Sequence, residues 1–271
     1  DYGSVEHLAK ALRQGFTYTG EYSAFRRRRH GNSTAGIPGQ RFTVFSQNHD
    51  QVGNRCLGER LSTLVPFEAL KLAAGIVMLS PYLPLIFMGE EYGETAPFPY
   101  FVNHGDPDLV QAVRHGRVAE FAAFHDRRHP PDPQDERTFL CARLDHKMAL
   151  DGHHQVLRLF YRQLLKLRRK VPALARLDRE ALHVEISEES GLLLLRRQAS
   201  HSEVVAVFNC GPATLNADIT LGAGRWVSLI DSATAAWLGP GSSIPETLHC
   251  NEKPVTLDIP GWTFILFGKE G

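Results

Sequence analysis

Two kinds of hydrophobic pattern divide the chain. Up to about residue 175, short apolar runs that end in turn residues alternate with longer segments whose apolar positions recur every three or four residues. The short runs are typical of buried strands, and the longer segments are typical of helices. The expected strands are 41–45 and 84–88. The expected helices are 5–12 with Ser4 as N-cap, 66–80, 106–124 with Asp106 as cap, and 155–170.

From about residue 179 the pattern changes to short β-prone runs that are separated by Gly, Pro and Asn. These runs are 192–195, 204–208, 226–230, 255–259 and 263–267. Such regularly spaced short strands indicate an antiparallel sandwich. We therefore expect two domains, a βα portion over residues 1–178 and a β-sandwich domain over residues 179–271.

The alternation of strands and helices in residues 1–178 indicates a parallel sheet that is covered by helices. A closed (β/α)8 barrel needs eight strands and roughly 250 residues, whereas this portion supplies two convincing parallel strands. No strand and no initiating Met precede the first helix. The expected fold is α/β: the C-terminal part of a (β/α)8 barrel followed by an all-β antiparallel sandwich, with the front of the barrel outside this sequence.

The polar residues behind the two expected strands are the main candidates for chemistry. The run 41–45 leads into an Asn-His-Asp motif at residues 48–50. A carboxylate and an imidazole at the C-terminal end of a parallel strand lie where barrels build their active sites. The second strand precedes Glu90 and Glu91. Because neighbours on a strand point to opposite faces, we expect one glutamate to hydrogen-bond within the structure and the other to be solvated or to bind a loop.

Charge and composition argue against several functional classes. The 30 basic and 30 acidic residues balance, so no nucleic-acid or membrane partner is expected. No leader opens the chain and prolines interrupt its longest apolar stretch, 72–88, which argues against secretion and membrane insertion. The four cysteines have no paired spacing, which indicates reduced thiols and a cytoplasmic protein. His125 and His129 have a zinc-binding spacing but no third ligand, so no metal site is expected.

Longer motifs surround these candidates. They are Phe-Thr-Val-Phe-Ser-Gln-Asn-His-Asp-Gln-Val-Gly-Asn-Arg at 42–55, Gly-Glu-Arg-Leu at 58–61, Phe-Met-Gly-Glu-Glu-Tyr-Gly at 87–93 and Pro-Phe-Pro-Tyr-Phe at 97–101. The match also includes Gly-Arg at 116–117 with Glu-Phe at 120–121. Together they resemble the α-amylase superfamily of glycoside hydrolases, over nearly the whole chain and more weakly over the sandwich. The extension of the Asn-His-Asp motif through Arg55 is most similar to the malto-oligosyltrehalose trehalohydrolase family and to close relatives such as glycogen-branching enzymes.

The resemblance implies roles for three residues. Asp50 matches the superfamily's third carboxylate, at the end of the seventh barrel strand, which binds sugar hydroxyls and stabilises the oxocarbenium-like transition state. His49 matches an imidazole that hydrogen-bonds the sugar, and Gln51 is expected to bind the trehalose end. The nucleophilic Asp and the general-acid Glu lie on earlier strands, and no matching motif occurs here. The implied substrate is malto-oligosyl trehalose or a related α-glucan, with neither an organic cofactor nor a metal.

Other functional classes stay open beside the trehalose-releasing glycosidase. A metal-dependent phosphohydrolase would carry the His-Asp doublet on a helix, whereas here the doublet follows an expected strand. A non-catalytic carbohydrate-binding module would use the sandwich, although Trp226, Trp237 and Trp262 are expected in its core. A branching or amylolytic relative also remains, because discrimination at the far subsites depends on loops outside this sequence.

Overall fold

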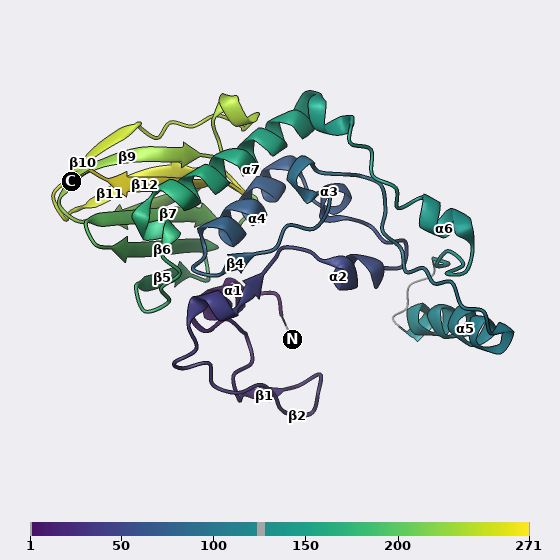
Figure 1. Cartoon of the computed structure of the whole chain (residues 1–271). Helices are drawn as coiled ribbons and strands as arrows, with labels where there is room; N and C mark the ends of the chain where they lie inside the picture. The colour runs from purple at the N-terminus through teal and green to yellow at the C-terminus, as the bar shows by residue number, and fades with distance from the viewer. Residues whose placement is uncertain (1, 124–127, 271) are drawn as a thin grey trace. The chain divides into compact units, whose positions relative to one another are not determined.

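The computed structural model describes residues 2–123 and 128–270 (Figure 1). The α-helices are α1 Val5–Gln14, α2 His49–Gly53, α3 Leu61–Leu64, α4 Phe67–Leu79, α5 Pro107–Ala123, α6 Glu136–Leu140, α7 Gly152–Lys170 and α8 Pro172–Ala175. The 3-10 turns are η1 Gly39–Arg41, η2 Glu90–Tyr92, η3 Met148–Leu150 and η4 Ala235–Trp237. The strands are β1 Tyr22–Ser23, β2 Arg28–Arg29, β3 Thr43–Val44, β4 Leu83–Pro84, β5 Leu182–Ser187, β6 Leu192–Ala199, β7 Ser202–Asn209, β8 Leu215–Thr220, β9 Gly224–Asp231, β10 Thr247–Cys250, β11 Pro254–Ile259 and β12 Phe264–Lys269.

These elements form two compact units. Unit 1 consists of Asp1–Val44, Lys71–Pro84 and Leu159–Gly271, and unit 2 consists of Phe45–Leu70 and Leu85–Arg158.

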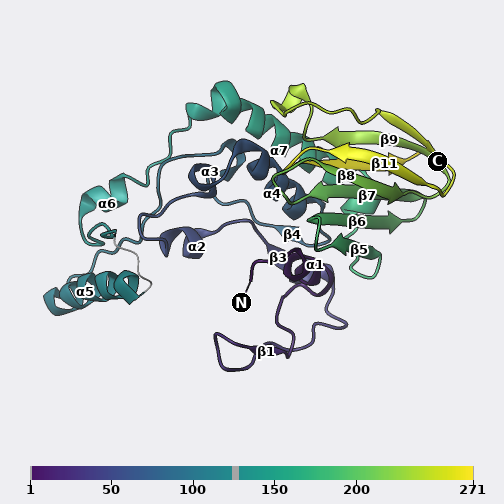
Figure 2. The ribbon, with the colours of Figure 1, turned by 180° about the vertical axis from the view of Figure 1, so that it is seen from behind.

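An antiparallel sandwich dominates unit 1. Six strands pair in the order β10-β9-β12-β7-β6-β5, and β11 pairs with β8 in a second sheet (Figures 1 and 2). Val205, Trp226 and Phe267 of the large sheet are fully buried and share one apolar cluster with side chains of the small sheet, among them Ile219 and Leu257. The sandwich predicted from the short β-prone runs is therefore present.

Helices cover the other face of the six-stranded sheet. The ring of Phe264 in β12 stacks on Phe208 of β7, with centroids 5.1 Å apart, and lies 6.0 Å from the ring of Phe160 in α7. Gly75 of α4 lies so close that a Cβ there would come within 2.4 Å of the Phe264 ring. Because both faces of the sheet are buried, its central strands consist of nearly continuous apolar residues.

Two buried arginines of unit 1 bind the C-terminal end of α4. Arg168 of α7 donates from Nη1 to Met78 O at 2.6 Å and to Ser80 O at 2.8 Å. Arg197 of β6 donates from Nη1 to Leu79 O at 3.0 Å and to Ser80 O at 3.1 Å. They satisfy carbonyls that a helix end leaves without intrahelical partners. Burial lowers the pKa of Arg168 to about 10, and burial together with Arg168 lowers the pKa of Arg197 to about 9.

Strands β3 and β4 form a parallel pair, with Thr43 opposite Leu83. The first expected strand is thus present but short, because η1 occupies residues 39–41. The second was misplaced: β4 ends at Pro84, where the expected strand began, and Met88 is exposed. Pro84 has no amide hydrogen with which to continue the ladder.

The predicted helices are confirmed. Ser4 Oγ caps α1 by accepting a hydrogen bond from His7 N, and Asp106 Oδ1 accepts one from Asp108 N at the start of α5. The helices predicted over 66–80 and 155–170 correspond to α4 and α7. Phe124, at the end of the helix predicted over 106–124, lies outside the described residues. Within the described parts of the chain, no helix is both long enough and apolar enough to cross a bilayer.

Candidate active site

The expected site residues lie in a short helix of unit 2. α2 begins after Asn48, whose Oδ1 accepts a hydrogen bond from Gln51 N at 2.9 Å. His49 and Asp50 occupy its first turn with side chains 71 % and 73 % exposed, and His49 Nε2 lies 3.4 Å from Asp50 Oδ1. We expected these residues in a loop behind a strand, whereas the Asn48 cap starts a helix there. The exposed carboxylate and imidazole, with the exposed Gln51 amide beside them, offer donors and acceptors for sugar hydroxyls.

The helical setting removes one argument against a metal-dependent phosphohydrolase, because the doublet does lie on a helix. Such chemistry would need additional metal ligands around the doublet. Over residues 2–123 and 128–270, no group of three or more His, Cys, Asp or Glu is placed to hold a metal ion. His125, one member of the His125–His129 pair, lies outside the described residues.

The residues before α2 anchor it within unit 2. Gln47 is 6 % exposed, and its Oε1 accepts a hydrogen bond from Leu61 N at 3.1 Å. Ser46 Oγ donates to Glu90 Oε1 at 2.7 Å, and Glu90 Oε2 accepts from Phe87 N at 3.1 Å. The segment that carries the candidate residues is therefore tied to the turn at residues 87–93.

That turn shows why the two adjacent glutamates differ. Glu90 is buried and hydrogen-bonded, as expected for one of the pair, and Glu91 is half-buried. The reason we gave was wrong, because both residues lie in the 3-10 turn η2 and not on a strand. Gly89 precedes η2 with φ of 84°, and a Cβ there would come within 2.7 Å of Glu94 Cβ. The left-handed backbone and the close approach both require glycine.

Glu94 is a buried polar centre that the sequence analysis missed. Its Oε1 accepts hydrogen bonds from Thr95 N at 2.8 Å and Ala96 N at 2.9 Å. Its Oε2 accepts from Asp145 N at 2.7 Å and from the Tyr92 hydroxyl at 3.1 Å. Burial alone would raise the pKa of this carboxyl, but the donors outweigh it and the pKa is lowered. Burial and the Glu94 carboxylate raise the pKa of Tyr92.

Arg60, within the Gly-Glu-Arg-Leu motif, also binds the backbone around this turn. The residue is 1 % exposed, donates from Nε to Ala96 O at 2.6 Å and from Nη1 to Met88 O at 2.8 Å, and lies 4.8 Å over the Phe87 ring. Burial lowers its pKa, although the nearby Glu94 carboxylate acts in the opposite direction. The motifs at 58–61 and 87–93 are therefore bonded to each other, and each is bonded to the segment that precedes α2.

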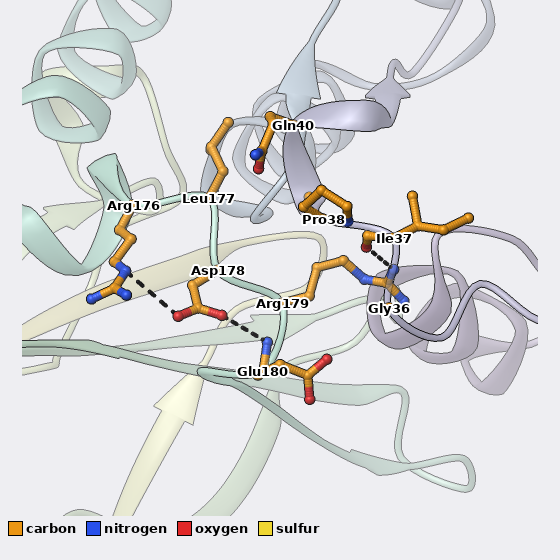
Figure 3. A pocket seen from close by; sticks show the side chains of 10 residues that line it. Gly36, Ile37, Pro38, Gln40, Arg176, Leu177, Asp178, Arg179 and Glu180 are labelled. Carbon is orange, nitrogen blue, oxygen red and sulfur yellow. Dashed lines mark hydrogen bonds and ion pairs between the residues drawn. The ribbon is translucent and has the colours of Figure 1, made fainter.

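A cavity of about 410 Å³ lies elsewhere, within unit 1 (Figure 3). Its walls are residues 36–40 and 176–180, and neither His49, Asp50 nor Gln51 lines it. Three of the charged side chains around it have partners: Arg176 pairs with Asp178 at 3.5 Å, and Arg179 Nη1 donates to Ile37 O at 2.7 Å. The bond from Arg179 joins the two segments of unit 1 that line the cavity, so these charged groups serve the fold.

The tryptophans of the sandwich do not form an exposed sugar platform. Trp226 is fully buried and donates from Nε1 to Gly222 O at 2.8 Å, as expected for a core residue. Trp237 and Trp262 are half-buried, and the Trp237 ring packs 5.2 Å from Phe160. The expectation of core packing is thus met fully at Trp226 and partly at the other two.

Comparison with known proteins finds relatives that share one name. It is 44 % identical over 194 residues to the malto-oligosyltrehalose trehalohydrolase of Rhizobium sp. (strain M-11), a match that covers 70 % of this chain and 32 % of that protein. It is 45 % identical over 170 residues to the protein of the same name from Saccharolobus solfataricus, a match that covers 63 % of this chain and 28 % of that protein. Over these residues the chain is similar to malto-oligosyltrehalose trehalohydrolases.

The malto-oligosyltrehalose trehalohydrolase of Deinococcus radiodurans is 35 % identical over 216 residues, 78 % of this chain and 36 % of that protein. The chain thus spans about a third of the length of the curated trehalohydrolases that it matches. No protein-family model matches the chain.

Among solved structures, the chain is similar to members of the α-amylase superfamily. A structure described as a putative α-amylase from Salmonella typhimurium is 32 % identical with a TM-score of 0.78, covering 98 % of this chain and 41 % of that one. The isomaltulose synthase of Protaminobacter rubrum is alike in fold alone, with 15 % identity, a TM-score of 0.53, and 88 % of this chain and 44 % of its own covered. These likenesses confirm the predicted fold class, a part of a (β/α)8 barrel followed by an antiparallel sandwich.

Proposed function

We propose that the protein to which this chain belongs hydrolyses the α-1,4-glucosidic bond next to the terminal trehalose of malto-oligosyl trehalose and releases trehalose. One observation carries the proposal. The curated relatives described above are 35–45 % identical over 63–78 % of this chain, and their names state that activity.

In this proposal Asp50 is the transition-state stabiliser. Its exposed carboxylate projects from the first turn of α2, where it can accept hydrogen bonds from sugar hydroxyls and face the positive charge that develops on the sugar ring. His49, with Nε2 3.4 Å from Asp50 Oδ1, binds the same sugar, and Gln51 binds the trehalose end. The anchored segment before α2 supports this assignment, because catalytic groups need a fixed backbone.

The nucleophile and the general acid belong, in the same proposal, to parts of the protein outside this chain. Residues 1–178 then contribute a portion of the catalytic barrel, and residues 179–271 form the sandwich domain. No organic cofactor or metal takes part, because two carboxylates and a water suffice for glycoside hydrolysis. The thiol form of the four cysteines supports a cytoplasmic location.

The test is Asp50→Asn in the whole protein with maltosyl-trehalose as substrate. We expect kcat to fall by about 10²- to 10³-fold while the thermal unfolding midpoint is retained, because the exposed carboxylate contributes to the transition state and little to the fold. Asp108→Asn is the matched control, an exposed aspartate in the first turn of α5. Near-normal turnover of the Asp50→Asn protein would contradict the assigned role.

A second candidate, an amylolytic enzyme, is favoured by the structure described as a putative α-amylase, which covers almost all of this chain. Rates of glucan cleavage on maltosyl-trehalose and on maltopentaose separate the two. A trehalohydrolase acts on the first and releases trehalose, whereas an α-amylase cleaves maltopentaose at least as well.

A further inference from the structure

Helix α2 is too short to set its own direction. It contains five residues and carries all three proposed site residues. An isolated helix of this length is unstable in water, so contacts with neighbouring elements decide where it points. Asn48 and the buried Gln47 hold its N-terminal side.

Arg117 of α5 holds the other end of α2. Its Nη2 donates to Gly53 O at 3.1 Å, and its Nη1 donates to Asn54 Oδ1 at 3.2 Å. Gly53 is the last residue of α2, and Asn54 is its C-cap. A guanidinium can reach both acceptors at once because its donors diverge in one plane, which the single ammonium of lysine cannot reproduce.

The guanidinium is itself held in place. Arg117 is 9 % exposed, and its guanidinium carbon lies 4.9 Å from the ring centroid of Tyr100 and 4.8 Å from that of Phe121. Glu120 Oε2, one turn along α5, accepts from Nη1 at 2.8 Å. Two aromatic faces and one carboxylate thus fix the side chain that bonds the C-terminal end of α2.

We propose that Arg117 is a positioning residue for the active site: by holding the C-terminal end of α2, it fixes the direction in which His49 and Asp50 project. The role rests on the proposed function of Asp50, because Arg117 acts through it. A rotation of α2 would displace the carboxylate from the sugar, and a misplacement of about 1 Å can cost about 10²-fold in rate.

The experiment compares Arg117→Met with Arg114→Met in the whole protein. Arg114 lies one turn earlier on α5 and pairs with Asp132 at 2.8 Å, so its loss removes an arginine and an ion pair without touching α2. We expect Arg117→Met to lower kcat on maltosyl-trehalose by about 10- to 100-fold with a smaller change in KM. Arg114→Met should leave both constants close to the parent values, and Arg117→Lys should recover only part of the loss.

A double variant separates positioning from general destabilisation. In an Asp50→Asn background, Arg117→Met should cause a much smaller loss of kcat than in the parent, because the carboxylate is already neutralised and only the contribution of His49 remains to be lost. An additive loss would show that Arg117 does not act through Asp50. Full activity of Arg117→Met beside an inactive Asp50→Asn would overturn the positioning role alone, whereas an active Asp50→Asn would overturn the proposed function.

Hydrogen exchange tests the structural step without any activity. The amides of Val52 and Asn54, which donate to Asn48 O and Asp50 O within α2, should exchange at least about tenfold faster in Arg117→Met than in Arg114→Met. Equal exchange in the two variants would overturn the proposal whatever the substrate of the enzyme.

Discussion

Glu94 is 1 % exposed and remains ionised because three backbone amides and the Tyr92 hydroxyl point at its two oxygens. Buried carboxylates with several such donors are stabilised in the charged form, against the penalty of burial. This role could not be predicted from the sequence, because Glu94 lies outside the 87–93 motif and its partner Asp145 is 51 positions along the chain. Only the folded backbone brings the donors together.

We predict that Glu94→Gln destabilises the protein by about 2–3 kcal/mol at neutral pH. The glutamine amide has one accepting oxygen where the carboxylate has two, and its NH2 group would face backbone N–H donors. The effect should depend on pH. The folded pKa lies below the ordinary value of 4.5, so the carboxylate stabilises the fold above about that pH and loses its contribution as the pH falls through the folded pKa.

Urea unfolding between pH 3 and pH 7, a range of about four units chosen to span the carboxyl titration, measures both effects. The parent should lose stability on acidification more steeply than Glu94→Gln. Glu91→Gln, in the same turn but half-buried, is the control and should change stability by less than about 1 kcal/mol. Parallel pH profiles for the parent and Glu94→Gln would contradict the linkage.

Elements with a strong periodic pattern were predicted from the sequence, and elements held by tertiary contacts were not. α4, α7 and the central strands of the sandwich bury wide apolar faces, so their patterns are long and clear. β8 alternates buried and exposed residues and was missed because its exposed positions include Asn216 and Asp218, residue types that are rare in strands. α2 was missed because Asn48 and Arg117, not its own propensity, make it a helix.

Gly75 of α4 gives a prediction at the scale of a helix on a sheet. Gly75→Ala should destabilise the protein by about 1–3 kcal/mol, because its Cβ would meet the Phe264 ring at 2.4 Å and push α4 from the strand. Gly116→Ala in α5 is the matched control: no heavy atom lies within 4 Å of its Cβ. There alanine's helix preference should stabilise by up to about 1 kcal/mol. Thermal unfolding of both variants gives the comparison, and a stabilised Gly75→Ala would refute the close packing.

At the scale of the whole molecule, the fold class could be predicted from the sequence. The His49–Asp50 doublet could be selected as a candidate, whereas the contacts that support it could not be predicted. Motifs 48–55 and 87–93 are runs of consecutive residues, so they can be recognised in the sequence. The bonds that join them, Ser46 with Glu90 and Arg117 with Gly53, link residues 44 and 64 positions apart. Spacings of that kind carry no periodic signal.

We predict that catalysis by this chain requires the rest of the protein. Among the described residues the parallel part of the fold is the β3–β4 pair, and glycoside hydrolysis needs two carboxylates across the bond. We expect residues 1–271 alone to release no trehalose above background, while the whole protein does so in the same assay. Far-UV circular dichroism of the isolated chain would establish that it is folded, and turnover by the folded chain alone would place the missing carboxylates within it.

All three tryptophans, Trp226, Trp237 and Trp262, belong to unit 1, and unit 2 contains none. Tryptophan fluorescence therefore reports on the sandwich and its covering helices, and it does not report on the segment around α2. Because Trp226 is shielded from solvent, its emission should lie at short wavelength and shift to the red only when the sandwich opens. Melting followed by emission, beside melting followed by far-UV ellipticity, would then show whether the two units unfold together or in sequence.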